Sequence, residues 1–517
     1  MNSRHATATS VRLLSLLLLA VAGLDAAELH WSRGDGTWPT ADREWTIDGR
    51  PEAWTEAAGA VLTGPGGDIT VHHEGVTVDA LRFESAGYRL LGDGAVTFTR
   101  IKSDATLVDF AAGAGSTIVD TRLIIRAAPS KGGITATIAN RTARALQLNG
   151  ALTVDRGDAP VPGDITLLFA SDDPNGTIRL NAGVRRAPGT RNVRLGFTGP
   201  GTIYLNQANH TDAGGFMDEG TLMVGAAGAL GEGPFSIGPH SATTTAMTLY
   251  TNGPVTIGNP IETKGNDHSR HTLGGATRDV SRFSGQIKLS GRRTPVRFVA
   301  VAGGRVDFTG QILNRQPMTK AGAGIVTLAA GNSTNSGPVT VEEGALLLLN
   351  TEGSATGRAP VTVRADAVLG GTGHASGPVT ADDPTAVLPP GDIDAGGIRT
   401  VGVLTLGGGL AAPRGLTLAC DLDGASADRI DLGAGPLDLG GTVTLNLHAL
   451  GPVHAGNVYT LATGTGQWSR TKPVFVLNAP KGYAPDPAHG DGTGCAYDPA
   501  ARTLTVQLQI AAPPGRP

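Results

Sequence analysis

Paired aspartates are the residues of this sequence best suited to chemistry, because two nearby carboxylates can act as general acid and base or bind Ca²⁺. Three pairs occur: Asp172 with Asp173, Asp382 with Asp383, and Asp392 with Asp394. Each pair lies beside Pro or Gly, as residues of solvated turns do. The turn interpretation therefore accounts for all three pairs, and a catalytic or calcium-binding role is the alternative.

Asp421 and Asp423, followed by Gly424, have the spacing that opens a calcium-binding loop. The later oxygen ligands that such a loop needs are absent. The sequence also has no nucleophile elbow, no Walker loop and no dinucleotide-binding fingerprint. We therefore predict no catalytic, cofactor-binding or metal-binding residues, and no cofactor.

Two histidine pairs are the remaining source of metal ligands. His72 adjoins His73, and His268 lies three residues before His271 in a polar stretch that we expect to be a loop. Neither pair has a Cys companion, so a zinc site is the less favoured interpretation.

Two kinds of arginine-containing motif have a composition suited to binding. The triplet Arg-Gly-Asp occurs at residues 33–35 and 156–158. It can bind integrins, but the turn composition of a chain with 76 glycines explains it better. Two arginine clusters have the charge to meet an acidic polysaccharide, with solvated loops as the alternative. They are Arg185, Arg186, Arg191 and Arg194, and Arg292, Arg293 and Arg297.

The composition limits the classes of protein to consider. The 517 residues are 40% hydrophobic, which argues against disorder, but only 4% aromatic, which indicates a narrow core in thin layers. The formal net charge is −4. Nucleic-acid binders usually carry a basic excess, so we expect no nucleic-acid partner.

The first 27 residues have the pattern of a secretory signal peptide. Arg4 and Arg12 precede an apolar run, and small residues follow it. Cleavage after Ala27 is favoured, Ala22 is a second candidate, and an uncleaved membrane anchor is the alternative. No later segment is predicted to span a membrane. We expect export to the cell surface, the extracellular space or the periplasm.

The elements that must position all these residues are short β-strands. Apolar residues alternate with Thr or Asp in runs such as 339–341 and 437–439, with Gly, Asn, Asp or Pro between the runs. Gly199, Leu205 and Asn209 recur at an offset of 123 as Gly322, Leu328 and Asn332. Repeated strand and turn units predict a β-solenoid with coils of roughly 20 to 25 residues. A chain of β-sandwiches is the alternative, but it requires more aromatic core residues.

The alternation also predicts which side chains face the interior of the solenoid. We expect stacked columns of Leu328, Val339, Val341, Leu346, Leu348, Val361, Val363, Leu404, Leu406, Leu416, Leu418, Leu437, Leu439, Val443, Leu445 and Leu447. A solenoid end exposes an unpaired strand edge, which needs a cap. We expect the N-terminal cap to contain Trp31, Trp38, Trp45 and Trp54.

Residues 319–349 strongly resemble the autotransporter-associated β-strand repeat, also called the passenger-associated transport repeat. The matching positions are Lys320, Gly322, Gly324, Thr327, Leu328, Asn332, Gly337, Val339, Gly344 and Leu346. Asn335 replaces the usual Tyr, and Pro338 stands where a second Gly is common. Residues 363–466 are similar to the continuation of the same family, and the likeness is weak at 100–190. The opening tryptophans resemble the start of many secreted members.

The resemblance implies an all-β fold, a right-handed parallel β-helix with an N-terminal cap and a β-rich C-terminal end. It implies a passenger-like protein, but the C-terminal segment lacks the pattern of a translocator barrel, so separate translocation machinery is expected. The expected segments are a signal peptide (1–27), a Trp-rich cap (28–98), a solenoid (99–466, clearest at 199–237 and 319–349) and a C-terminal β cap and tail (467–517).

Two functions follow from these expectations. The resemblance implies a secreted or surface-displayed structural or adhesive protein of a bacterial envelope, not an enzyme, with glycans or neighbouring cell-surface components as partners. The β-helix fold alone leaves a polysaccharide lyase or glycoside hydrolase as the alternative. The only two cysteines, Cys420 and Cys495, are compatible with a disulfide or with two free thiols.

Overall fold

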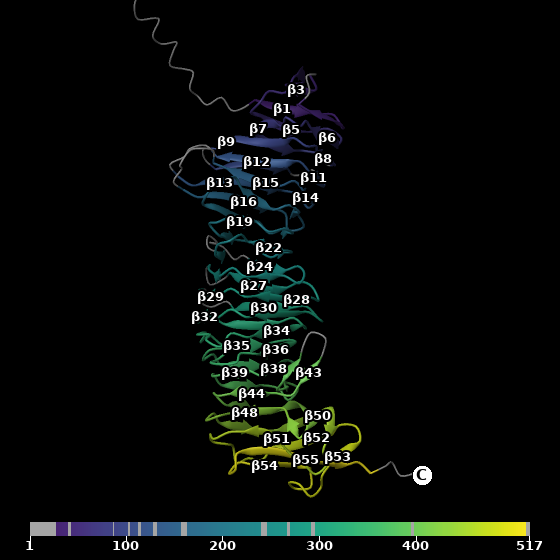
Figure 1. Ribbon diagram of the computed structural model, residues 1–517, viewed down its shortest axis with the longest axis vertical. Coiled ribbons are helices and arrows are strands. Elements are labelled where there is room, and N and C mark those ends of the chain that lie inside the picture. The colour runs from purple at the N-terminus through teal and green to yellow at the C-terminus, as the bar shows by residue number, and fades with distance from the viewer. Residues whose placement is uncertain are drawn as a thin grey trace, which may run out of the picture.

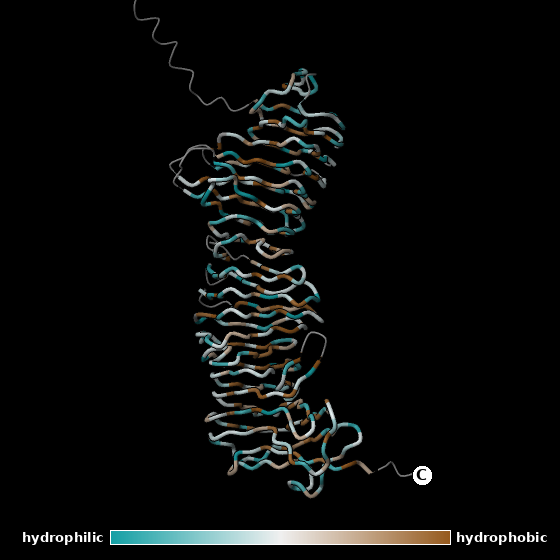
Figure 2. The backbone as a smooth tube through the Cα atoms, viewed as in Figure 1, coloured by the Kyte–Doolittle hydropathy of each residue, from teal (hydrophilic) through white to brown (hydrophobic). Residues whose placement is uncertain are grey.

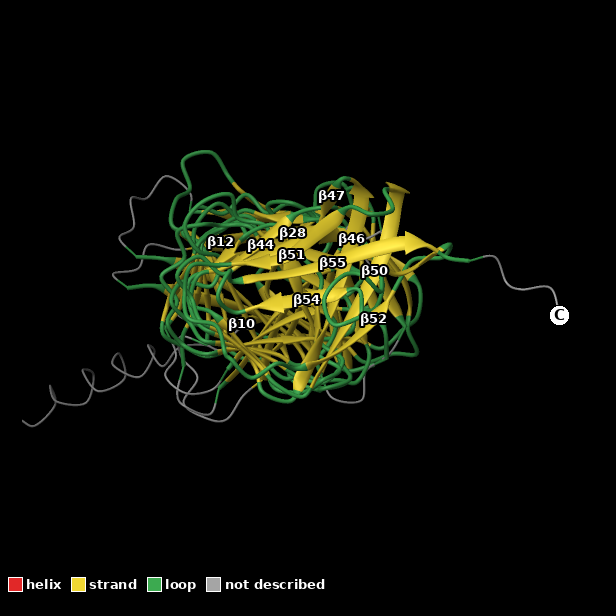
Figure 3. Ribbon diagram, turned by 90° about the horizontal axis from the view of Figure 1, so that it is seen from below, coloured by secondary structure: helices red, strands yellow, loops and turns green. Residues whose placement is uncertain are grey.

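Alternating apolar residues form strands throughout the chain, as the pattern predicts. The computed structural model describes residues 27–39, 43–85, 87–101, 104–111, 115–127, 132–156, 163–238, 246–265, 269–290, 295–393 and 398–512. The predicted signal peptide lies outside these residues except for Ala27. Within the described ranges every regular element is a strand (Figure 3). None of these residues forms a helix long and apolar enough to cross a membrane.

The strands stack into an elongated column with the cap at one end and the C-terminal strands at the other (Figure 1). Sheet 1 runs along the N-terminal part and contains β1 (Glu28–Trp31), β3 (Trp45–Ile47), β4 (Arg50–Glu52), β5 (Ala58–Leu62), β7 (Val76–Phe83), β9 (Ala95–Ile101), β10 (Ala105–Phe110), β12 (Arg122–Ala127), β13 (Ile134–Asn140), β15 (Leu152–Asp155), β16 (Ile165–Ser171), β18 (Val184–Arg186), β19 (Val193–Thr198), β21 (Gly215–Met217), β23 (Phe235–Ile237), β26 (Ile261–Thr263), β29 (Ile287–Leu289) and β32 (Ile312–Asn314).

Sheet 2 runs nearly the full length of the column. Its strands are β2 (Gly36–Trp38), β6 (Gly67–Val71), β8 (Tyr88–Leu91), β11 (Thr117–Val119), β14 (Ala145–Leu148), β17 (Thr177–Leu180), β20 (Thr202–Leu205), β22 (Gly220–Val224), β24 (Ala246–Thr251), β27 (Arg270–Gly275), β30 (Val296–Ala300), β33 (Met318–Ala321), β35 (Val339–Val341), β37 (Val361–Val363), β40 (Val379–Ala381), β45 (Leu410–Ala412) and β49 (Leu437–Leu439). At ~4.8 Å between neighbouring strands, this sheet extends over about 80 Å.

Two further sheets form the remaining faces of the C-terminal half. Sheet 3 contains β25 (Thr256–Ile257), β28 (Val280–Phe283), β31 (Arg305–Phe308), β34 (Ile325–Leu328), β36 (Ala345–Leu348), β38 (Val368–Gly371), β41 (Val387–Leu388), β46 (Gly415–Gly424), β47 (Ser426–Ala427), β50 (Thr442–Val453) and β52 (Val474–Asn478). Sheet 4 contains β39 (His374–Ala375), β44 (Val403–Leu406), β48 (Arg429–Asp431), β51 (Val458–Thr463), β53 (Tyr483–Pro485), β54 (Cys495–Asp498) and β55 (Thr503–Ile510). A separate hairpin pairs β42 (Asp392–Ile393) with β43 (Arg399–Thr400).

The coils stack in parallel and in register, which makes the protein a parallel β-helix. Val339 of β35 pairs with Val361 of β37, 22 residues later (361 − 339), within the predicted coil length. Some coils in the N-terminal half are longer than predicted. Leu123 of β12 pairs with Leu152 of β15, 29 residues later (152 − 123), because this turn contains two strands of sheet 1, β12 and β13.

The long-range repeat does not mark equivalent faces of the column. β20 belongs to sheet 2, whereas the matching β34 belongs to sheet 3. Likewise β22 lies in sheet 2 and the matching β36 in sheet 3. The repeat therefore encodes a strand–turn–strand unit, and the number of strands in the intervening coils decides on which face each copy lies.

The interior of the column is the predicted one. Each of the 16 predicted core residues is at most 3% exposed. Apolar stretches recur from coil to coil along the whole column instead of gathering in one patch (Figure 2). The narrow, continuous core explains why few aromatic residues are needed.

Two features stabilise the corners of the coils: a glycine that allows close backbone approach and a buried lysine that binds carbonyl groups. A Cβ at Gly324 would lie 2.1 Å from the carbonyl oxygen of Val301 in the preceding coil, so only glycine allows this approach. Lys320 occupies a core column, and its Nζ donates hydrogen bonds to the carbonyls of Gly322 at 2.5 Å and Glu343 at 2.6 Å. Desolvation lowers the pKa of Lys320 to about 8. This lysine ties two successive turns together.

Antiparallel strands close both ends of the column. At the N-terminus β3 pairs antiparallel with β1 and with β4, and ring centroids of Trp45 lie 5.3 Å from Trp31, 5.2 Å from Trp38 and 4.9 Å from Trp54. At the C-terminus β55 pairs antiparallel with β51, β53 and β54. The four tryptophans thus form one cluster, as expected of the N-terminal cap.

Replacing Leu346 with Asp should lower the free energy of unfolding by several kcal/mol, because it places an unpaired charge in the core. Thr340→Asp, on the outer face of β35, is the matched control and should have little effect. Denaturant unfolding measures both. A Leu346→Asp variant that unfolds like the parent would contradict the side-chain register.

Deleting residues 28–60 should promote aggregation, because it removes the antiparallel hairpin and exposes the edge of the parallel stack. Sedimentation and light scattering measure association, and far-UV circular dichroism reports whether the remaining strands stay folded. A folded, monomeric deletion variant with the solubility of the parent would rule out the capping role.

Candidate functional site

The N-terminal part of sheet 1 carries a ladder of alternating charges across four successive coils. Arg82 lies on β7 and is in register with Asp109 on β10. Arg141 directly follows β13, and Asp172 directly follows β16. Parallel stacking therefore places two arginines and two aspartates in alternation on one outer face of the column.

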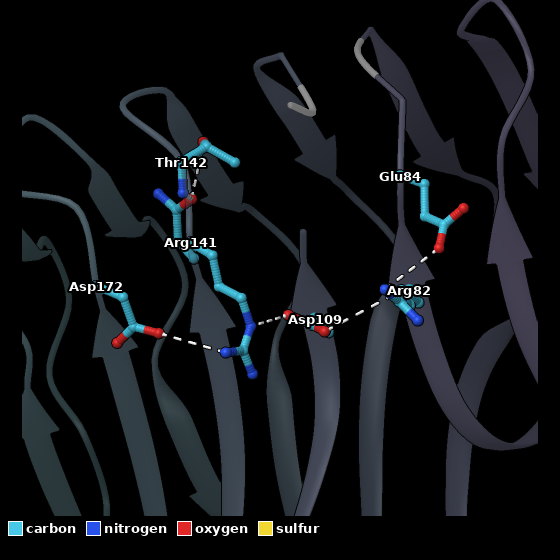
Figure 4. Close-up of polar contacts among 7 residues, drawn as sticks. Arg82, Glu84, Asp109, Arg141, Thr142 and Asp172 are labelled. Carbon is cyan, nitrogen blue, oxygen red and sulfur yellow. Dashed lines mark hydrogen bonds and ion pairs between the residues drawn. The ribbon is translucent and has the colours of Figure 1, made fainter. Parts of the chain in front are cut away.

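The side chains of this ladder contact one another in sequence (Figure 4). Asp109 lies between two guanidinium groups, with Oδ1 2.7 Å from Nε of Arg141 and Oδ2 3.9 Å from Nε of Arg82. Arg141 also reaches Asp172 at 3.9 Å, and Arg82 reaches Glu84 at 3.3 Å. The hydrogen bond from Arg141 to Asp109, together with their charge interaction, raises the pKa of the Arg141 guanidinium.

An open hollow of about 500 Å³ lies over this ladder and is lined by Arg82, Glu84, Asp109, Ala111 and Arg141. A general acid requires a carboxyl group that stays protonated near neutral pH. Asp109 instead accepts a hydrogen bond from Arg141 and lies 3.9 Å from Arg82. The hollow is a polar surface with its charges paired, and it has room for a hydroxylated ligand such as a sugar.

The predicted aspartate pairs are divided between ion pairs and turns. Asp172 joins the ladder, whereas Asp173 accepts a hydrogen bond from the N–H of Asn175, as a turn residue does. Asp382 forms an ion pair with Arg364. Asp383 accepts hydrogen bonds from the N–H and hydroxyl of Thr385, which lower its pKa. The turn interpretation is confirmed for Asp173 and Asp383.

Asp392 lies on β42, in a hairpin over the outer face of sheet 3, and Asp394 lies outside the described residues. The carboxylate of Asp392 is 3.7 Å from Nη1 of Arg305. Nε of Arg305 contacts Asp307 at 2.8 Å, and Asp307 also accepts a hydrogen bond from Thr327 at 2.7 Å. Asp392 thus belongs to an ion-paired contact between the hairpin and the sheet.

The other strand of this hairpin covers a buried acidic pair that sequence patterns did not reveal. Nε of Arg399 on β43 lies 3.0 Å from Asp421, whose side chain is 2% exposed. Asp428 is fully buried and accepts hydrogen bonds from the N–H groups of Gly402 at 2.7 Å and Asp421 at 2.8 Å. Desolvation, with a contribution from Asp421, raises the pKa of Asp428 to about 7. Asp421 and Asp423 therefore do not form a calcium loop.

The described histidines of the two predicted pairs lie in different surroundings. The rings of His72 and His73 lie against each other, 3.9 Å between centroids, and Nδ1 of His72 lies 3.9 Å from Glu74. The expectation that His271 lies in a polar loop is wrong. His271 is 1% exposed on β27, because its alternation with Thr272 points it into the core. Burial lowers its pKa to about 4. His268 lies outside the described residues, which contain no group of three potential metal ligands.

The Arg-Gly-Asp triplet at 33–35 is engaged in the cap. Arg33 pairs with Glu44 at 2.6 Å, and Asp35 accepts a hydrogen bond from the N–H of Asp68 at 2.8 Å. Of the second triplet, residues 157 and 158 lie outside the described ranges. The first triplet is thus part of a structural corner, in agreement with the turn interpretation.

The two cysteines are both buried and unpaired. Cys420 belongs to β46 and Cys495 to β54. Burial raises the pKa of the Cys420 thiol well above its usual value and that of Cys495 to about 12. Both thiols act as small core residues in this structure.

A polar ladder that the sequence analysis missed follows the ends of sheet 2 strands. Nδ2 of Asn206 donates to Asn181 at 2.6 Å, Nδ2 of Asn181 to Asn149 at 2.7 Å, and Nδ2 of Asn149 to Asp120 at 2.7 Å. Arg89 pairs with Asp120 at the end of the ladder. The coil spacings are irregular, so no fixed sequence period links these residues.

The arginine clusters differ in their surroundings. Arg185 and Arg186 line a second open hollow, and Arg194 pairs with Asp164 at 2.9 Å. Arg297 approaches Glu342 at 3.4 Å, whereas Arg292 and Arg293 lie outside the described residues. Of the first cluster, Arg185 and Arg186 therefore share a defined surface feature, whereas Arg191 and Arg194 are not among its lining residues.

No protein-family model matches this chain, and comparison with curated proteins finds no match either.

Replacing Asp428 with Asn should change how stability depends on pH. The folded-state pKa is about 7 and the ordinary value is 3.8, so the folded protein binds this proton more tightly. The protonated Asp428 therefore contributes fully to the free energy of unfolding below about pH 4. This contribution, at most ~4 kcal/mol, is lost as the pH rises to about 7. Relative to the variant, the wild type should lose stability across this window.

Denaturant unfolding between pH 4 and pH 8 measures this difference. His271 contributes with the opposite sign, since its folded-state pKa is lowered, but it is present in both proteins and cancels. Asp423→Asn, which changes an exposed carboxylate of the same strand, is the control. Parallel stability curves for wild type and Asp428→Asn would show that Asp428 is ionised throughout.

Proposed function

We propose that this protein is an exported, non-catalytic β-helix that is displayed on a bacterial envelope or secreted from it, as a structural or adhesive element. The signal-like N-terminus and the resemblance of residues 319–349 to the autotransporter-associated β-strand repeat support export. The continuous parallel stack supports a role that depends on length and on repeated surface. A long solenoid face binds by summing weak contacts, for which glycans and cell-surface components are suitable partners.

The observation that carries the non-catalytic part of this proposal is the pairing of the candidate acids. Asp109 contacts two arginines, Asp172 contacts one, and Asp383 is held within its own turn. Catalysis by two carboxylates needs one acid held protonated and one base facing the same substrate. The one described carboxyl with a pKa raised to about 7, that of Asp428, is fully buried beneath the hairpin.

A polysaccharide lyase or glycoside hydrolase is the alternative. The observation in its favour is the open hollow of about 500 Å³, where Arg82, Glu84, Asp109 and Arg141 converge on one side of the column. Arginine and carboxylate groups on one face are what such an enzyme would use to hold an acidic sugar. The two functions differ in whether bound polysaccharide is cleaved.

The purified mature protein should cleave no member of a panel of acidic and neutral polysaccharides, because the candidate acids described above are ion-paired or held in turns. Release of reducing ends and of unsaturated products measures turnover. Turnover that is lost in Asp109→Asn, Asp172→Asn or Asp392→Asn, but retained in Asp173→Asn, would establish the enzyme in place of the structural role.

Export is measured separately, by fractionating cells that produce the full chain and treating intact cells with protease. The proposal expects the column to reach the medium or to be accessible at the cell surface. Retention of the chain in the cytoplasm would contradict it.

A further inference from the structure

We infer that the hollow beside β18 binds an anionic segment of a polysaccharide, a sugar chain that carries carboxylate or sulfate groups. This inference rests on the proposed adhesive function and names the ligand class and the site. The hollow is open, has a volume of about 490 Å³ and is lined by Arg185, Arg186 and His210 together with the turn at 187–190. Its volume lies within the roughly 300–1,000 Å³ of ordinary ligand sites.

Parallel stacking brings the basic residues of two coils together at this place. Val184 of β18 is fully buried, so the alternation of the strand points Arg185 to the outside, where it is exposed. The N–H of His210 donates to the carbonyl of Val184 at 2.8 Å, which places His210 beside β18 on the next coil. His210 is also exposed.

Arg186 builds the wall of the hollow and is itself occupied. Its Nη1 contacts Asp212 at 3.1 Å and donates to the carbonyl of Thr190 at 3.1 Å, while Nε donates to the carbonyl of His210 at 2.9 Å. Desolvation acts to raise the pKa of Asp212, but hydrogen bonds from the N–H groups of Val193 and Asn192, together with the charge of Arg186, outweigh it and lower the pKa. The ionised Asp212 thus fixes Arg186, which holds the turn in place.

Arg185 supplies the unpaired charge that a ligand can bind. Its guanidinium forms no hydrogen bond or ion pair with any residue in the described part of the chain, and neither does the ring of His210. The acids beside the hollow, Asp212 and Glu232, both face Arg186, at 3.1 Å and 3.7 Å. A preorganised wall with an unpaired guanidinium is suited to a carboxylate or sulfate, which it can bind through charge-assisted hydrogen bonds.

The hollow beside β18 and the ladder hollow do not differ in size. Both are open and have nearly the same volume, about 490 Å³ and about 500 Å³. Around the ladder hollow, Arg82 and Arg141 are neutralised by Asp109, Glu84 and Asp172. The hollow beside β18 differs from it in retaining an unpaired cation.

The small number of unpaired basic side chains at this hollow favours a polysaccharide over other polyanions. Nucleic acids are bound through many phosphate contacts, and anionic membranes attract clusters of four to eight basic residues. Arg185 and His210 supply two basic groups in a chain whose net charge is −4. A sugar chain with spaced anionic groups and many hydroxyls fits a polar hollow with few cations on the side of a long column.

The test is equilibrium binding of the full mature chain to polygalacturonate, to dextran sulfate and to neutral dextran, at low and moderate salt. Wild type should bind one or both anionic polymers and not neutral dextran, and the two anionic arms distinguish carboxylate from sulfate. Arg185→Ala should weaken this binding about tenfold, as expected for one lost charge-assisted hydrogen bond, and Arg185→Ala with His210→Ala should weaken it further.

Arg144→Ala is the matched control, because it removes one exposed guanidinium from the turn between β13 and β14. Its affinity should equal that of the wild type. An equal loss in Arg144→Ala and Arg185→Ala, or equal binding of charged and neutral dextran, would overturn the site. A protein that reaches the cell surface but binds neither anionic polymer would overturn this inference and leave the proposed function standing. A protein that stays in the cytoplasm but binds the anionic polymers through Arg185 would support this inference and overturn the proposed function.

Discussion

The hydrogen-bonded pairing of each coil with the next is the constraint on which the rest of this structure depends. A single coil buries only a thin stripe of apolar side chains and leaves its backbone groups unpaired, so it has no stability of its own. Parallel, in-register stacking satisfies the backbone and merges the stripes into one core. The corners must then pass very close to one another, which explains the glycine at Gly324 and the carbonyl-binding lysine at Lys320.

In-register stacking also sets the rules for the outer surface. Outward side chains of neighbouring coils lie only ~4.8 Å apart, so equal charges in one column would repel. The chain avoids this repulsion by alternation, as in the ladder that contains Asp109 and Arg141, or by amide pairs, as from Asn149 to Asn206. Such ladders pair polar side chains of neighbouring coils with one another.

Two surface sites depart from this regular pairing of side chains between coils. The hairpin of β42 and β43 covers the outer face of sheet 3 and buries Asp421 and Asp428. At β18 the inter-coil pairing of charges is incomplete, and Arg185 points outward without a described partner. Both places join residues from separate coils.

The sequence by itself determined the strands, the stacked core and the need for capped ends, because apolar alternation and glycine punctuation are local and each buried column repeats them. It also indicated that Asp173 and Asp383 belong to turns. The tertiary structure alone decided which coils hold two strands of sheet 1, on which face each repeat lies and which charges meet. Arg399 contacts Asp421 only because a hairpin folds over the sheet, and His271 lies in the core only because its strand is in register with its neighbours. Such contacts depend on coil length and register, which vary from turn to turn and leave no fixed spacing in the sequence.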